Sequence, residues 1–66
     1  MTDMSNEAKS RILAQHAYQI RRYVETDGEK SIIAGGMARG LEMTMTYLGI
    51  EFERMESQLV RRLEND

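Results

Sequence analysis

The chain has 66 residues, no cysteine, one histidine and a formal net charge of −2. This composition excludes disulfides, thiolate metal sites and cysteine nucleophiles, and a single histidine cannot build a zinc site. The acidic balance argues against general binding to duplex DNA, and no stretch approaches the roughly 20 apolar residues of a membrane span. We therefore expect one domain, residues 1–66, in the cytoplasm, with no cofactor.

Residues 6–25 are predicted to form the first helix. Ser5 or Asn6 is suited to cap its free amides, and Glu7 is placed to pair with Arg11 one turn later. His16 beside the apolar face is typical of a packed, hydrogen-bonded histidine rather than a catalytic one. Apolar residues recur at the spacing of one helix face, namely at Ile12, Leu13, Ala17, Ile20 and Val24.

A turn is predicted at residues 26–28. Gly28 tolerates the left-handed backbone that a tight connection needs. Thr26 and Glu29 fit a capping box for the next helix, with Asp27 as a competing cap. So short a connection makes the flanking helices antiparallel neighbours.

Residues 29–63 are predicted to form one longer second helix. Gly49 is its one plausible break, and a glycine inside a helix costs only about 1 kcal/mol relative to alanine. The fold class is then all-α, an antiparallel two-helix hairpin. The apolar stripe of the second helix runs through Ile33, Met37, Leu41, Thr44, Leu48, Phe52, Met55, Leu59 and Leu63.

The unequal lengths of the two helices predict self-association. A helix of about 35 residues outreaches one of about 20 by roughly 20 Å, so the first helix covers the second only to about Gly49 or Phe52. An apolar stripe left bare beyond that point is typical of an interface. We expect a closed homo-oligomer, between a dimer and a hexamer, whose interface contains Phe52, Met55, Leu59 and Leu63.

Small residues crowd the segment from Ala34 to Gly40, which includes three glycines. Each glycine weakens the helix by about 1 kcal/mol, so something should compensate. One interpretation is close packing between helices, and the other is close approach of the backbone to a ligand. The first is the more common reason for small residues on a helix.

Nothing in the sequence predicts an enzyme. No second histidine and no cysteine completes a nucleophile–base pair. Glu51, Glu53 and Glu56 lack the Glu-x-x-His pattern of metal sites in helical bundles, and they are typical of a solvated helix face.

A ligand-binding surface has more support. Arg11, Gln15, Tyr18 and Arg22 share one stripe of the first helix, and arginine with an aromatic ring suits a phosphorylated, base-bearing ligand. Lys30 and Ser31 occupy the first turn of the second helix, where free amides favour anions. Arg39 follows on the same helix. The alternative is the ordinary wet face of an amphipathic helix.

The central segment resembles the helical-hairpin domain of phage anti-CBASS and anti-Thoeris sponge proteins. That domain shows Ala-Tyr-x-Ile and a valine in the first helix, a polar turn ending in Glu-Lys-Ser, and then a helix of spaced apolar and small residues. The matching residues here are Ala17, Tyr18, Ile20, Val24, Glu29, Lys30, Ser31, Met37 and Gly40.

The resemblance implies a compact helical oligomer that sequesters a nucleotide immune messenger, a cyclic oligonucleotide or a cyclic ADP-ribose isomer, without cleaving it. Such a protein acts in the host cytosol. The implied pocket lies between protomers and points to Tyr18, Lys30 and Ser31 as ligand-binding residues. Arg22 and Arg39 are added to this site on the basis of charge.

Two other functions remain open at this stage. The hairpin could be an adaptor or inhibitor that binds a host protein through a methionine-rich surface, with anchors at Met43, Met45, Tyr47 and Ile50. Less favoured is an RNA-binding hairpin dimer of the kind that regulates plasmid copy number, because the net charge is acidic.

Overall fold

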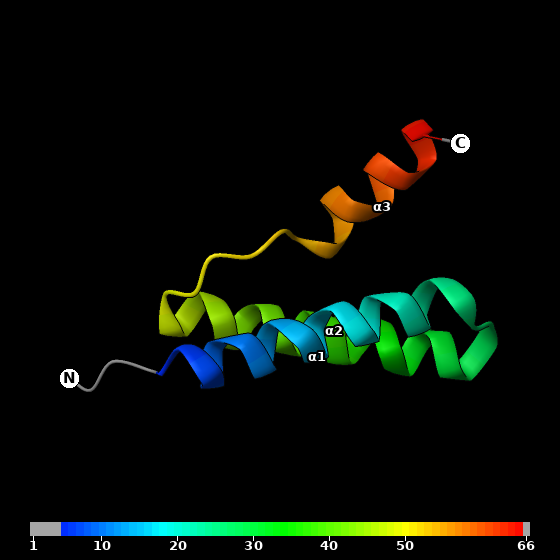
Figure 1. Ribbon diagram of the computed structural model, residues 1–66. Coiled ribbons are helices and arrows are strands. Elements are labelled where there is room, and N and C mark those ends of the chain that lie inside the picture. The colour runs from blue at the N-terminus through cyan, green and yellow to red at the C-terminus, as the bar shows by residue number, and fades with distance from the viewer. Residues whose placement is uncertain (1–4, 66) are drawn as a thin grey trace.

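The computed structural model describes residues 5–65, and over that range it is all-helical without strands. Helix α1 spans Asn6–Glu25, α2 spans Gly28–Leu48 and α3 spans Met55–Asn65. Helices α1 and α2 lie side by side and antiparallel, while α3 leaves the pair at an angle (Figure 1). The predicted all-α class and the two antiparallel helices are confirmed. None of the described helices is long and apolar enough to cross a membrane.

The start of α1 follows the sequence closely. The Ser5 hydroxyl accepts a hydrogen bond from the Ala8 amide at 3.1 Å, which satisfies one of the free donors of the first turn. Arg11 pairs with Glu7 at 2.7 Å on the exposed surface. Both predictions for this end of the helix are confirmed.

The turn between α1 and α2 differs from the predicted capping box. Thr26 closes α1 instead, because its amide and its hydroxyl both donate to the Arg22 carbonyl. Asp27 is the N-cap of α2 but makes no side-chain hydrogen bond there. Gly28 has a φ of 63°, the left-handed conformation predicted for it, although it belongs to the first turn of α2.

Small residues make the contact between α1 and α2. Ala34 and Ala38 are fully buried on α2, and Ile20 is fully buried on α1. A Cβ at Gly35 would lie 2.9 Å from the Tyr23 ring, so the close approach of the helices requires glycine at that position. The packing interpretation of the small-residue segment is therefore correct for Gly35.

The predicted apolar stripe of α2 does not form this contact. Ile33, Met37 and Leu48 are 52%, 49% and 44% exposed. The buried face is the one that carries alanine and glycine, because small side chains let two helix backbones approach. The larger apolar residues point elsewhere, which leaves part of α2 unpartnered within one chain.

The prediction of one helix over residues 29–63 is wrong, because α2 ends at Leu48. Gly49 adopts a φ of 73°, and the next amide, that of Ile50, donates to the Met45 carbonyl at 2.9 Å. This is the Schellman arrangement, in which a left-handed glycine closes a helix and an apolar residue follows it. Ile50 and Met45 are both buried.

The break at Gly49 removes the basis of the predicted oligomer interface. The linker of residues 50–54 turns back along the hairpin (Figure 1). Met55 is 4% exposed and packs with Ile20 and Ala38, and Leu59 packs against the same cluster. The Phe52 ring meets His16. Of the four predicted interface residues, only Leu63, 75% exposed, lies open to solvent.

Candidate functional site

The residues predicted to bind a ligand occupy separate parts of the chain. Tyr18 and Arg22 lie one turn apart on α1, and the Arg22 guanidinium carbon is 5.9 Å from the centroid of the Tyr18 ring. Tyr18 is 52% exposed. At that separation the guanidinium is attracted to the face of the ring. The pair presents an aromatic surface and a group of cationic donors at one place.

Lys30 and Ser31 lie in the first turns of α2, beside the connection between the helices. Lys30 is exposed. The Ser31 hydroxyl donates to the Tyr23 carbonyl at 3.0 Å, so the proton of this hydroxyl is committed to joining α2 to α1. Its oxygen can still accept a hydrogen bond.

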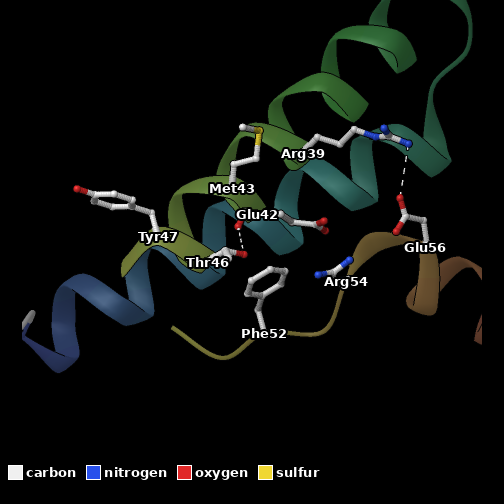
Figure 2. A pocket seen from close by; sticks show the side chains of 8 residues that line it. All are labelled: Arg39, Glu42, Met43, Thr46, Tyr47, Phe52, Arg54 and Glu56. Atoms are coloured by element: carbon white, nitrogen blue, oxygen red, sulfur yellow. Dashed lines mark hydrogen bonds and ion pairs between the residues drawn. The ribbon is translucent and has the colours of Figure 1, made fainter. Parts of the chain in front are cut away.

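Arg39 belongs to a different place, a pocket of about 530 Å³ between the C-terminal half of α2 and the linker that follows. In Figure 2 Phe52 extends from the linker toward Thr46 and Glu42 of α2, while the Tyr47 ring points away from them. It contains two arginines, two glutamates and two aromatic rings. The lining residues are Arg39, Glu42, Met43, Thr46, Tyr47, Phe52, Arg54 and Glu56.

The charges of this pocket are only partly paired. Arg39 and Glu56 lie 3.5 Å apart, with their side chains 69% and 61% exposed, so solvent weakens their attraction. Arg54 extends between Phe52 and Glu56 (Figure 2). Guanidinium groups beside aromatic rings suit an anion that carries a planar or apolar part.

Glu42 fixes the inner wall of the pocket. Its Oε2 accepts from the His16 ring nitrogen Nε2 at 2.7 Å and from the Met55 amide at 2.7 Å. The carboxylate therefore also binds the N-terminal end of α3, where free amides favour a negative charge. His16 is 3% exposed, as expected for a packed, hydrogen-bonded histidine.

The Phe52 ring completes this wall. Its centroid lies 5.5 Å from that of His16, and the planes meet at 73°, which is the favoured edge-to-face arrangement. The His16 ring therefore contacts both Glu42 of α2 and Phe52 of the linker, which ties the linker to the hairpin.

Sequence reasoning missed the roles of Glu42 and Arg54. A signal for Glu42 was available, since it follows Ala34 and Ala38 at intervals of four and so lies on the same helix face as the alanines. A carboxylate on a buried face requires a polar partner, and His16 was the only histidine to offer one. Arg54 carries no such signal, because its place depends on the path of the linker.

Residues 5–65 contain no group of three or more histidines or carboxylates placed to hold a metal ion. The His16 nitrogen that faces Glu42 is committed to that carboxylate. Cationic donors and aromatic rings, which are suited to binding a ligand, meet at two places, the Tyr18–Arg22 pair and the α2–linker pocket.

Comparison with known proteins adds no relative to this description: the chain matches no protein family, no curated protein and no solved structure.

Proposed function

We propose that this protein captures a cyclic nucleotide messenger, a cyclic oligonucleotide or a cyclic ADP-ribose isomer, and holds it between copies of the chain without cleaving it. The observation that carries the proposal is the Tyr18–Arg22 pair, a half-exposed ring with a guanidinium 5.9 Å from its centroid. A base stacks on such a ring, and a phosphate takes the guanidinium donors through two parallel hydrogen bonds. The sequence resemblance to phage sponge proteins supports the same ligand class.

The other predicted site residues contribute to the proposed binding site in different ways. Lys30 is exposed and adds positive charge at the start of α2. Ser31 mainly positions α2 through its bond to the Tyr23 carbonyl. Arg39 lies in the α2–linker pocket, so it reaches the same ligand only if a second copy brings that pocket to Tyr18. The proposed site is therefore one that assembly of the chain completes.

Thermal melting against a panel of cyclic dinucleotides, cyclic trinucleotides and cyclic ADP-ribose isomers tests the proposal. A ligand at about 100 times its Kd stabilises the folded state by about 2.7 kcal/mol, which raises the melting temperature of a domain this small by roughly 10 °C or more. The matching linear nucleotides control for unspecific anion effects. The bound ligand should be recovered intact after the protein is denatured.

Tyr18→Ala should abolish the shift, whereas Val60→Ala should retain it, because Val60 is 52% exposed on α3 and lies outside the Tyr18–Arg22 pair and the α2–linker pocket. A flat melting temperature across the whole panel at high ligand excess contradicts the proposal. If Tyr18→Ala retains the shift in melting temperature, the ligand binds at a place other than the Tyr18–Arg22 pair.

Exposed side chains at the end of α2 favour a second candidate, the binding of a protein partner. Met43 and Tyr47 are 74% and 90% exposed, and both border the α2–linker pocket. Met45 and Ile50 are buried, at 0% and 8% exposed, so they cannot serve as the anchors predicted from the sequence. Capture of a defined host protein that Tyr47→Ala or Met43→Glu abolishes, with helix content unchanged, supports this candidate.

A further inference from the structure

We infer that the outer face of α2 is the surface through which two copies of this chain associate. The outer face is the side of α2 directed away from α1. Its residues are all exposed, recur with the period of one helix face, and comprise Ile33, Gly36, Met37, Gly40, Thr44 and Tyr47.

The composition of this face is that of a buried surface. None of its six residues is charged. Of its two hydroxyls, that of Thr44 donates back to the Gly40 carbonyl at 3.0 Å, so this donor stays satisfied when it is covered, and that of Tyr47 lies near the end of the helix. Ile33 and Met37, 52% and 49% exposed, flank the small residues. A face of this kind, left bare, is typical of a protein interface.

The glycines of α2 separate into two kinds. Gly35 is required by the Tyr23 ring, which a Cβ would approach to 2.9 Å. At Gly36 and Gly40 a Cβ would meet nothing within 4 Å, and neither has a positive φ. Each nevertheless weakens the helix by about 1 kcal/mol relative to alanine. No contact within the described chain offsets that loss at Gly36 and Gly40, whereas the backbone of a second helix packed over them would offset it.

The exposed area of the chain is larger than that of a compact monomer of the same mass. The chain exposes 5279 Å², while a compact monomer of 7.6 kDa exposes about 4,300 Å². The excess of roughly 1,000 Å² compares with about 800 Å² that each partner buries in a stable interface. The excess belongs to the chain as a whole, including α3 where it leaves the hairpin, and it is large enough to contain one such interface.

A second copy is the occupant that this face fits. In a two-fold dimer the same patch serves both partners, so the patch must complement itself. Two uncharged faces do so without repulsion between two chains of net charge −2. Ile33 and Met37 of each copy supply the ridges that fill the groove over Gly36 and Gly40 of the other. The α2–α2 contact replaces the interface predicted around residues 52–63.

The dimer also bears on the α2–linker pocket. Met43 and Tyr47 line that pocket and stand at the edge of the outer face. A partner seated on α2 would therefore border the open side of the pocket. Tyr18 and Arg22 lie on α1, whereas this contact is on the side of α2 directed away from α1, so the dimer alone does not bring the Tyr18–Arg22 pair to the α2–linker pocket. The inference does not depend on the proposed ligand, since association is measured in its absence.

Sedimentation velocity of the full chain over a range of concentrations, without ligand, tests the inference. The wild-type protein should sediment with at least twice the chain mass. Gly40→Arg should raise the dissociation constant at least tenfold, because it places a long cation in the groove. Its helix content should be unchanged, since the position is open within one chain. Ser10→Arg adds the same charge on the exposed surface of α1 and should associate like the wild type.

Met37→Glu is a second disruptive variant, and it replaces no glycine. It should also raise the dissociation constant at least tenfold, so the test stands even if Gly40→Arg disturbs the helix. A wild-type chain that remains a monomer at high concentration overturns the inference. So does association that survives both Gly40→Arg and Met37→Glu. Loss of ligand binding with intact association would overturn the proposed function alone.

Discussion

The α1–α2 hairpin and α3 are attached to the same small core in different ways. The hairpin contact is distributed over fully buried positions such as Ile20, Ala34 and Ala38, so many residues hold it. Helix α3 is attached only over its first two turns, where Met55 is buried, its amide binds Glu42, and Leu59 packs against the core cluster. Farther along, Val60 and Leu63 are 52% and 75% exposed. The hairpin should therefore unfold as a unit, and α3 should detach from it at lower cost.

The largest effect is expected from Ile20→Ala. Ile20 is fully buried and packs with Ala38 of α2 and Met55 of α3, so truncation leaves a cavity between all three helices. Substitutions of this kind cost about 2–5 kcal/mol, which for so small a domain should remove most of its stability. Chemical denaturation followed by circular dichroism measures the loss. Val24→Ala, at a residue 44% exposed, is the control and should cost much less.

Glu42→Ala should release α3 while the hairpin persists. The substitution removes the shared acceptor of His16 and the Met55 amide, and hydrogen bonds to a charged group contribute about 1.5–3 kcal/mol. Amide hydrogen exchange should lose protection at Met55 and along α3, and retain it at Ile20. Glu53→Ala removes a carboxylate that pairs with Arg61 at 3.0 Å on the surface and serves as the control. Equal loss of protection in all three helices would contradict this separation of the two regions.

The difference between the regions also explains what the sequence could predict. The bounds of α1 and the position of the turn follow from local signals, a capping serine and a left-handed glycine. The end of α2 was equally local: Gly49 followed by the apolar Ile50 is a helix stop, and treating Gly49 as a minor cost inside one long helix overlooked it. The helix bounds depart from the sequence prediction at Leu48 because of this one residue.

The candidate site was less accessible to sequence reasoning. The Tyr18–Arg22 pair follows from helix spacing and was predicted. The α2–linker pocket joins Arg39 to Phe52 and Arg54 through a chain reversal, and no local pattern specifies where that linker lies. The buried face of α2 was also misassigned, since hydrophobicity favoured Ile33 and Met37 while the closer backbone contact favours Ala34 and Ala38.

Two neighbouring glycines of α2, Gly35 and Gly36, should respond in opposite directions to substitution by alanine. Gly35→Ala places a Cβ 2.9 Å from the Tyr23 ring, and overpacking of this kind costs about 1–3 kcal/mol. Gly36→Ala meets nothing within 4 Å and should stabilise the dilute, monomeric hairpin by about 0.5–1 kcal/mol through helix propensity. Urea denaturation of both variants at low concentration measures the opposite signs. Tyr23→Leu in the Gly35→Ala background should recover part of the loss.

The smallest effect is expected at the ion pair between α2 and α3. Arg39 and Glu56 are 3.5 Å apart, and both side chains are more than half exposed. Pairs of this kind contribute about 0–1 kcal/mol and are screened by salt. Glu56→Gln should therefore change the free energy of unfolding by less than about 0.5 kcal/mol, and the difference from wild type should vanish at high ionic strength. A larger or salt-independent loss would mean that α3 is held along its surface as well as at Met55. The Glu42 contact would then not be the main attachment of α3, because the Arg39–Glu56 ion pair would contribute a comparable free energy.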